Sequence, residues 1–381
     1  MPIQTIPFAD LENRLHRMPV LADVHPLVPL ALPEGTRIVS DSVELLAELD
    51  SPHLHHESNL LLLETKSPLA QRLPVVGCYQ LPSLALLNER LPFNLAYARR
   101  HLLRTVDLAG HISQDVTRDM AHHMADVIVF YLVDGLSYWD VGNWPFDIQP
   151  CFVDGPSVTY RFIEGDEKQV NELVGFPGIM GRPPLAERLY GLGYRQARGY
   201  SYWDRENIIA DYMFRGVSLT RISSFEGLVA LLRESPLQPP TFIQIVQEGL
   251  DGLAHHRREL RRAEIEAAID KIRIDVSMLV DWLKVSGYSV TVYLTADHGI
   301  LWRTEHPFRP LLYSGERQPR YARVTTSQDP PAQVTRFLAG NVSYDLFHYP
   351  YLAKDIKSND SGVHGGLSAQ ESIVPLVKIR G

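Results

Sequence analysis

VIVFYLV, residues 127–133, is an uninterrupted apolar run that is followed at once by Asp134-Gly135. Strands at the centre of a parallel sheet are buried on both faces and read as solid runs of this kind. Three further runs share this character: TFIQIV at 241–246, SVTVYLT at 289–295 and SIVPLVKI at 372–379. We therefore expect these four segments to be strands of one sheet.

Helix-like segments lie between these strands. The spacing of apolar residues predicts helices over 185–192 and over 260–285, the second of which ends at Gly287. Strands that alternate with helices are joined by right-handed crossovers. The sequence thus predicts an α/β fold, with a mostly parallel sheet and helices on both of its faces.

The first hundred residues predict a separate, smaller unit. TRIVS from Thr36 and NLLLL at 59–63 are strand-like, and the segment SVELLAEL is helix-like. This suits a small α/β module of unknown role over residues 1–100. We expect a linking helix over 101–125 and a catalytic-size domain over 126–381.

Composition limits the function classes. The chain has 381 residues, 45% hydrophobic and 22% charged, and its net charge of −8 has the wrong sign for coating nucleic acid through bulk electrostatics. Its two cysteines, Cys78 and Cys151, are far apart in the sequence, which excludes a disulfide framework. The longest apolar run is about a third of a membrane span, so we expect a soluble, cytoplasmic protein with no membrane partner.

Each of the four strand-like runs has Asp, His or Gly at one end. The motifs, in chain order, are Asp134-Gly135, Asp251-Gly252 with His255, Asp297-His298-Gly299, and His364-Gly365-Gly366 just before the last run. Ligands in open α/β sheets bind beyond the carboxyl ends of the strands. We therefore expect these side chains to gather at one edge of the sheet.

Each motif also has an ordinary structural explanation. An Asp-Gly pair after a strand is commonly a turn, His298 could cap a helix, and His364 could fit a tight bend. Three Asp and three His at four strand ends are nevertheless the donor set of a carboxylate–imidazole metal site. Six ligands exceed what one tetrahedral zinc ion takes, so the sequence predicts two metal centres with mixed oxygen and nitrogen ligands.

Two ions close together can clamp the oxygens of a phosphoryl displacement, which also needs a nucleophile. PSVT at 156–159 supplies hydroxyl groups. Thr159 is the candidate nucleophile and Ser157 the competing one. Hydroxyl groups beside proline are commonly loop caps, so this motif gains its meaning from the metal cluster.

The order of these motifs resembles the PglZ-domain branch of the alkaline phosphatase superfamily. The resemblance covers roughly residues 126–381 and includes Leu367-Ser368 and Glu371 after the last His-Gly-Gly. It implies an alkaline-phosphatase-like domain that hydrolyses phosphate mono- or diesters through a phosphorylated enzyme. It also implies zinc, less often manganese, as the ions, and an occurrence in bacterial phage-exclusion systems and signalling proteins.

The resemblance further implies a role for each matching residue. One ion would be held by the nucleophile and by residues from the first and third strand ends: Asp134, Thr159, Asp297 and His298. The other would be held by the second strand end and the late histidine: Asp251, His255 and His364.

Arginines near these motifs are candidates for phosphate binding, because guanidinium groups form bidentate bonds with phosphate oxygens. Residues 300–323 carry five arginines against two glutamates, which predicts a loop-like cap over the site at about 300–345. The candidate substrate-binding residues are Arg161, Arg258, Arg320 and Arg323. The alternative for most of them is a solvated surface on which they pair with nearby acids.

The main prediction is a two-metal phosphodiesterase. Local cations in an acidic chain favour nucleotide-like diesters, cyclic nucleotides or short single-stranded nucleic acid over a long duplex, and protein partners would come from a phage-defence system. Two alternatives stay open: a non-catalytic scaffold or nucleic-acid-binding subunit of a defence complex, and a phosphomonoesterase or mutase of the same superfamily. A sulfatase is disfavoured, because Cys151 lies in CFVDG, which does not have the form of a sulfatase modification motif.

Overall fold

The computed structural model describes two compact units, which meet in the sequence between Leu102 and Leu103. The described residues are 25–32, 36, 81–121, 125–155, 185–201, 218–222, 224–257, 260–313, 317–324, 329–339 and 342–381, together with five short strands before residue 80. Within these residues, no helix combines the length and the apolar character that crossing a membrane requires.

The N-terminal unit contains a five-stranded sheet in the order β1-β5-β2-β4-β3, and every neighbouring pair in it is parallel. The strands are β1 (Thr5–Ile6), β2 (Val20–Asp23), β3 (Arg37–Val39), β4 (Leu60–Leu62) and β5 (Val75–Tyr79). Helices α4 (Leu84–Arg90) and α5 (Leu95–His101) follow them. The apolar runs TRIVS and NLLLL thus predicted β3 and β4 correctly.

The larger unit is built on an eight-stranded sheet in the order β10-β9-β11-β7-β12-β20-β8-β6. Its strands are β6 (Leu103–Arg104), β7 (Val127–Val133), β8 (Ile148–Phe152), β9 (Gln196–Ser201), β10 (Ser218–Ile222), β11 (Thr241–Gln247), β12 (Val290–Ala296) and β20 (Ile373–Arg380). The five strands from β10 to β12 are parallel to one another. The four predicted strands are confirmed as β7, β11, β12 and β20, and the fold is a mostly parallel α/β fold.

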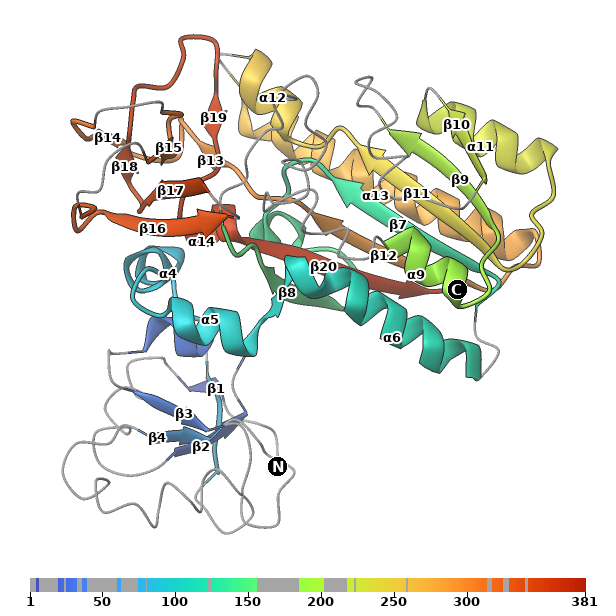
Figure 1. Ribbon diagram of the computed structural model, residues 1–381, viewed down its shortest axis with the longest axis horizontal. Helices are drawn as coiled ribbons and strands as arrows, with labels where there is room; N and C mark the ends of the chain where they lie inside the picture. The colour runs from blue at the N-terminus through green and yellow to red at the C-terminus, as the bar shows by residue number, and fades with distance from the viewer. Residues whose placement is uncertain are drawn as a thin grey trace. The chain divides into compact units, whose positions relative to one another are not determined.

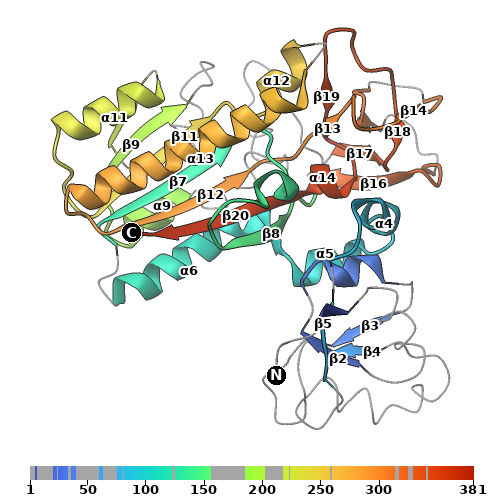
Figure 2. The same ribbon diagram turned by 180° about the vertical axis from the view of Figure 1, so that it is seen from behind.

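Helices cover both faces of this sheet (Figures 1 and 2). Helices α6 (Leu108–Ala121) and α9 (Leu185–Gly191) lie on one face, and α13 (Arg262–Val285) lies on the other. The inner stripe of α13 buries Ile265, Ile269, Ile272, Val276, Leu279 and Leu283, at the spacing of one helical face. The helix ends before Gly287, whose φ of 86° continues the chain in a conformation that glycine accepts readily.

Strand β20 runs antiparallel to both of its neighbours, β12 and β8. In the parallel part of the sheet, Val133 is level with Gln247 and with Ala296, so β7, β11 and β12 end at one edge. Because β20 runs the opposite way, it begins at that same edge. Residues that precede β20 therefore join residues that follow the three parallel strands.

The predicted linking helix over 101–125 is wrong in part. Helix α5 stops at His101 and α6 begins at Leu108, and between them Leu103–Arg104 pairs as β6 with Cys151 and Phe152 of β8. The backbone groups of β6 are satisfied by a neighbouring strand instead of by a helical turn. Tertiary pairing overrides the local helical periodicity there.

The segment predicted as a loop-like cap contains strands. Strands β15 (Tyr321–Arg323), β17 (Val342–Phe347) and β16 (Val334–Ala339) form an antiparallel sheet in that order, here called the cap sheet. Two short pairs flank it: β13 (Leu301–Trp302) with β19 (Gly362–Val363), and β14 (Arg309–Pro310) with β18 (Tyr351–Leu352). Ala322, Val334, Phe347 and Ala353 form a small apolar core beneath the cap sheet.

Candidate metal centre

The six predicted Asp and His ligands come together at the edge where β7, β11 and β12 end. Asp134 and Asp297 directly follow β7 and β12, and Asp251 begins the short helix α12 (Asp251–His256) after β11. His255 lies one helical turn after Asp251, on the same face of α12. Backbone bonds join the loops, because Leu136 N donates to His298 O at 2.7 Å and Asp251 N donates to Asp134 O at 3.1 Å.

Three donor atoms form a nearly equilateral triangle. His255 Nε2 lies 3.2 Å from Asp251 Oδ1, His364 Nε2 lies 3.3 Å from the same oxygen, and the two nitrogens are 3.2 Å apart. Metal–ligand bonds of about 2.0–2.1 Å in a tetrahedral arrangement place neighbouring donors about 3.3 Å apart. The triangle therefore has the size of one face of a tetrahedral zinc-type site.

A second group of donors lies beside the first. His298 Nε2 is 3.3 Å from Asp134 Oδ1 and 3.7 Å from Asp297 Oδ1, and the latter oxygen accepts a hydrogen bond of 3.1 Å from Gly135 N. Asp134, Asp251 and His298 offer ligand atoms within 4.8 Å of one another. Asp251 thus faces both groups, a position that the sequence did not predict.

The rings of two histidines join the two groups. His298 and His364 stack at 3.9 Å between ring centroids, with 6° between the ring planes. His298 is 3% exposed. This packing fixes both imidazoles, so the second group lies directly beside the triangle.

Two of the three imidazoles turn Nδ1 toward an acceptor. His298 Nδ1 lies 3.2 Å from the carbonyl oxygen of Gly299, and His255 Nδ1 lies 3.6 Å from Oδ2 of Asp360. Such oxygens are acceptors, so Nδ1 carries a proton and Nε2 is the nitrogen that each ring turns toward the carboxylates. In metal-free protein a proton on Nε2 can face the carboxylate oxygens, and a metal ion can take the place of that proton, as at imidazole ligands held by a second partner.

The charges of the cluster shift the pKa values of its imidazoles. Burial on its own would lower the pKa of His298, but the negative charges of Asp297 and Asp134 raise it to about 10. Burial, and then the positive charge of His298, lowers the pKa of His364 to about 3. The carboxylates thus attract positive charge to this edge, while His364 is neutral, the form in which an imidazole binds a metal.

Sequence reasoning missed Asp360, a carboxylate that is 4% exposed. The neighbouring Ser361 donates from its backbone N to Ala254 O at 2.7 Å, which ties this segment to α12 and brings Asp360 beside His255. Asp360 lies in a polar SND stretch with no strand end nearby in the sequence. No sequence signal could have identified it.

The remaining predicted site residues differ in outcome. Thr159, Ser157, Arg161 and Arg258 lie outside the described residues. Arg323 is exposed on β15, as a substrate-binding arginine requires. The structure contradicts the prediction for Arg320, which is 0% exposed and donates to Glu371 and to two backbone carbonyl groups, so it cannot reach a substrate.

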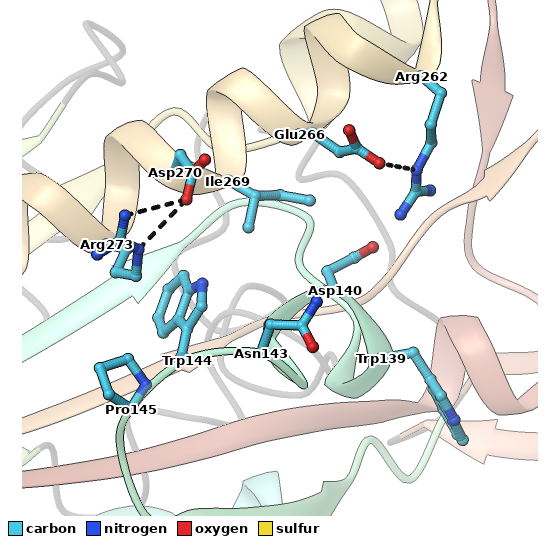
Figure 3. A pocket seen from close by; sticks show the side chains of 10 residues that line it. All are labelled: Trp139, Asp140, Asn143, Trp144, Pro145, Arg262, Glu266, Ile269, Asp270 and Arg273. Carbon is cyan, nitrogen blue, oxygen red and sulfur yellow. Dashed lines mark hydrogen bonds and ion pairs between the residues drawn. The ribbon is translucent and has the colours of Figure 1, made fainter.

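A pocket of about 380 Å³ lies between α13 and the segment that follows Asp134 (Figure 3). Along α13, Arg262 pairs with Glu266 and Arg273 pairs with Asp270, and Trp144 lies below them. None of the six predicted ligands lines this pocket. Its arginines are engaged with carboxylates, so the pocket offers little to a polyanion.

Comparison with known proteins gives partial similarities in structure. The chain is similar to murine ectonucleotide pyrophosphatase/phosphodiesterase 5, with TM-score 0.45 and 14% identity over 66% of this chain and 87% of that chain. It is also similar to the C-terminal periplasmic domain of phosphoethanolamine transferase EptC from Campylobacter jejuni, with TM-score 0.37 and 10% identity over 68% and 80% of the two chains. The C-terminal periplasmic domain of EptC from Escherichia coli, in complex with Zn, is similar with TM-score 0.29 and 14% identity over 47% of this chain and 65% of that chain.

These structural neighbours are members of the alkaline phosphatase superfamily. No protein-family model matches the chain, and no curated protein sequence matches it. The resemblance to PglZ domains therefore depends on the ordered motifs alone and stays a prediction.

Proposed function

We propose that this chain is a metal-dependent phosphohydrolase that cleaves phosphodiesters, with Thr159 as its nucleophile. The observation that carries the proposal is the triangle of His255 Nε2, His364 Nε2 and Asp251 Oδ1, whose sides of 3.2 to 3.3 Å fit a tetrahedral ion. The oxygen and nitrogen donors suit zinc, and manganese is the second candidate.

The proposed ligand sets follow the two groups of donors. One ion would be held by Asp251, His255 and His364, and the other by Asp134, Asp297, His298 and the hydroxyl of Thr159. When bound, such ions lower the pKa of a coordinated hydroxyl and neutralise charge on the transferred phosphoryl group. The Thr159 oxygen would bond to phosphorus as the ester oxygen leaves, and water would then cleave the phosphothreonine.

The chain's own residues prepare the site for this reaction. The Gly299 carbonyl and the Asp360 carboxylate keep a proton on Nδ1 of His298 and His255, which leaves each Nε2 free to bind. Stacking of His298 on His364 holds both rings in place before any ligand arrives. A preorganised site does not have to reorganise during the reaction.

The preference for diesters is supported by the exposed arginines that follow the site in sequence. Arg303, Arg309, Arg317 and Arg323 are all exposed. Such cations suit a substrate that extends beyond one phosphate, and short single-stranded nucleic acid or a nucleotide-like diester has this form.

Metal analysis followed by kinetics tests the proposal. Protein stripped with a chelator and reloaded with Zn²⁺ or Mn²⁺ should hold two ions per chain and cleave an aryl phosphodiester faster than the matching monoester. Thr159→Ala should reduce kcat by about 10⁴-fold or more and keep most of the metal, while Ser157→Ala stays active. Metal-loaded protein that cleaves neither ester nor a short oligonucleotide would favour the non-catalytic scaffold instead.

A further inference from the structure

Arg320 and Glu371 form a buried ion pair next to the loops that carry His298 and His364. Their side chains are 0% and 1% exposed. Arg320 donates from Nε to Glu371 Oε1 at 3.0 Å and from Nη2 to Oε2 at 2.8 Å, a bidentate arrangement. Its Nη1 donates to the carbonyl oxygens of His348, at 3.1 Å, and Tyr351. The guanidinium thus joins the segment around the cap sheet to the helical turn that precedes β20.

The same Glu371 carboxylate holds the loop that carries His364. Glu371 Oε1 accepts a hydrogen bond of 3.0 Å from Gly366 N, and Oε2 accepts one of 2.6 Å from Ser368 Oγ. A Cβ atom at Gly366 would lie 2.7 to 2.8 Å from three guanidinium atoms of Arg320, so the backbone rests directly on the guanidinium. Any side chain at position 366 would push the loop and Arg320 apart.

The main chain of Glu371 reaches the other ligand loop as well. Gly299 N donates to Glu371 O at 3.0 Å, and Gly299 directly follows His298. One residue therefore anchors the backbone within two positions of two proposed ligands, His298 and His364. The orientation of Glu371 is in turn fixed by Arg320.

We propose that the Arg320–Glu371 pair is a positioning device that holds His364 and His298 in their metal-binding orientation. A buried ion pair is no more stabilising than a well-packed apolar pair of similar size, because desolvation offsets the attraction. What distinguishes this ion pair from an apolar pair is its set of directional hydrogen bonds. The proposal deepens the proposed function, on which it rests for the identity of the ligands.

The chain contains a matched control pair. Arg336 donates from Nε to Asp345 Oδ1 at 2.9 Å and from Nη2 to Oδ2 at 3.1 Å, and Asp345 is 0% exposed. This pair joins β16 to β17 inside the cap sheet. It has the same bidentate chemistry as the Arg320–Glu371 pair without the bond to the His364 loop.

The test removes both charges of each pair together, so that no unpaired buried charge is left. The variants are R320M/E371Q and the control R336M/D345N. Zn²⁺ affinity is measured by competition with a chromophoric chelator, and folding by near-ultraviolet circular dichroism and thermal unfolding. We expect R320M/E371Q to bind the ion of the His364 group about 10-fold or more weakly, and R336M/D345N to stay within about twofold of the wild type.

Equal ion affinities in the two double variants would overturn the proposal. If R320M/E371Q does not fold, R320K replaces it, because lysine keeps the charge and loses the planar fork. R320K should then show weakened Zn²⁺ binding in protein that near-ultraviolet circular dichroism shows to be folded, and wild-type affinity in folded R320K would overturn the proposal.

The imidazole nitrogen resonances of His298 and His364 give the same comparison in metal-free protein. They should shift in R320M/E371Q, or in R320K, and not in R336M/D345N. These readouts separate the two proposals, since wild-type protein that binds ions without hydrolysing phosphate esters contradicts the proposed function alone. Wild-type protein that binds no ion also contradicts that function, and the resonances then decide whether the pair orients the two histidines.

Discussion

Buried carboxylates lie at both ends of the central sheet, and the two sets are neutralised in different ways. At the end where β20 finishes, Asp115 and Asp119 of α6 are 8% and 3% exposed. They form ion pairs with Lys378 and Arg380, among them a 3.2 Å contact from Arg380 to Asp119. The chain supplies permanent cations for its own buried anions at this end.

The other end of the same sheet pairs its carboxylates with imidazoles. Asp251 faces His255 and His364, and Asp297 lies beside His298. An imidazole is a neutral ligand or a weak cation, depending on pH, whereas Lys and Arg stay charged. The end of the sheet at Asp115 and Asp119 thus has its charges balanced by the chain itself, whereas the end at Asp251 and Asp297 is suited to bind a cation from solution.

The largest effect on ion binding should come from removing a carboxylate at the end of the sheet where the imidazoles lie. Asp251→Asn should weaken ion binding and lower kcat/KM by more than about 100-fold, because Asp251 faces both groups of donors. The metal-free variant should be less stable than the wild type, because, against the effect of burial, the three histidines around Asp251 hold the pKa of its carboxyl below the usual range, and the variant loses that attraction. Elemental analysis, kinetics and urea unfolding in chelator measure these effects.

Asp115→Asn is the matched change at the opposite end. It leaves Lys378 without its close partner and should lower the free energy of unfolding by about 1–2 kcal/mol, a value reduced for partial exposure. Its ion content should equal that of the wild type. Loss of ions in Asp115→Asn, or full ion content in Asp251→Asn, would remove the functional difference between the two ends.

A smaller loss of ion affinity should come from replacing Asp360, whose carboxylate faces Nδ1 of His255. Asp360→Asn keeps the shape of the side chain but loses the negative charge that holds the proton on His255 Nδ1, so ion affinity should fall by about 10–100-fold. Asp355→Asn, at an exposed position of the same segment, is the control and should leave affinity unchanged. Competition with a chromophoric chelator distinguishes the two, and equal affinities would show that Asp360 does not orient the ligand.

The ligands could be predicted because two simple signals coincide in the sequence. Solid apolar runs identify buried strands, and Asp or His at their ends identifies the ligand edge. His364 was predicted for an incomplete reason, since it precedes its strand and reaches the edge through the antiparallel direction of β20. Strand direction depends on long-range pairing and is not encoded in an apolar run.

The supporting residues could not be predicted, because their partners are distant in the sequence. Arg320 is 51 positions from Glu371, and an arginine in a proline-rich, basic segment reads as a phosphate-binding candidate. Asp360 reaches His255 through the backbone bond of Ser361 to Ala254, which is 107 positions away in the sequence. Burial distinguishes a supporting charge from a substrate-binding one, and burial appears only after folding.

The smallest effect concerns His348, which directly follows β17 of the cap sheet and whose charge environment is the reverse of that at His298. Burial, and then the positive charge of Arg320, lowers the pKa of His348 to about 4, and its Nε2 lies 2.8 Å from Thr335 Oγ1. Because the unfolded value is about 6.5, the unfolded chain binds more protons than the folded chain between these two pH values. The stability from His348 is therefore present above about pH 6.5 and is lost as the pH falls toward 4.

Replacing this residue with glutamine should remove that loss. The half-buried position reduces the expected effect, so wild-type protein in chelator should lose about 1 kcal/mol more than His348→Gln between pH 7 and pH 5. Urea unfolding at pH 7, 6 and 5 measures the difference. The exposed His256→Gln is the control and should keep the wild-type decline, since it retains the His348 imidazole. A decline of the same size in His348→Gln and wild type would mean that Arg320 and burial do not hold His348 neutral, and the contrast with His298 would then fail.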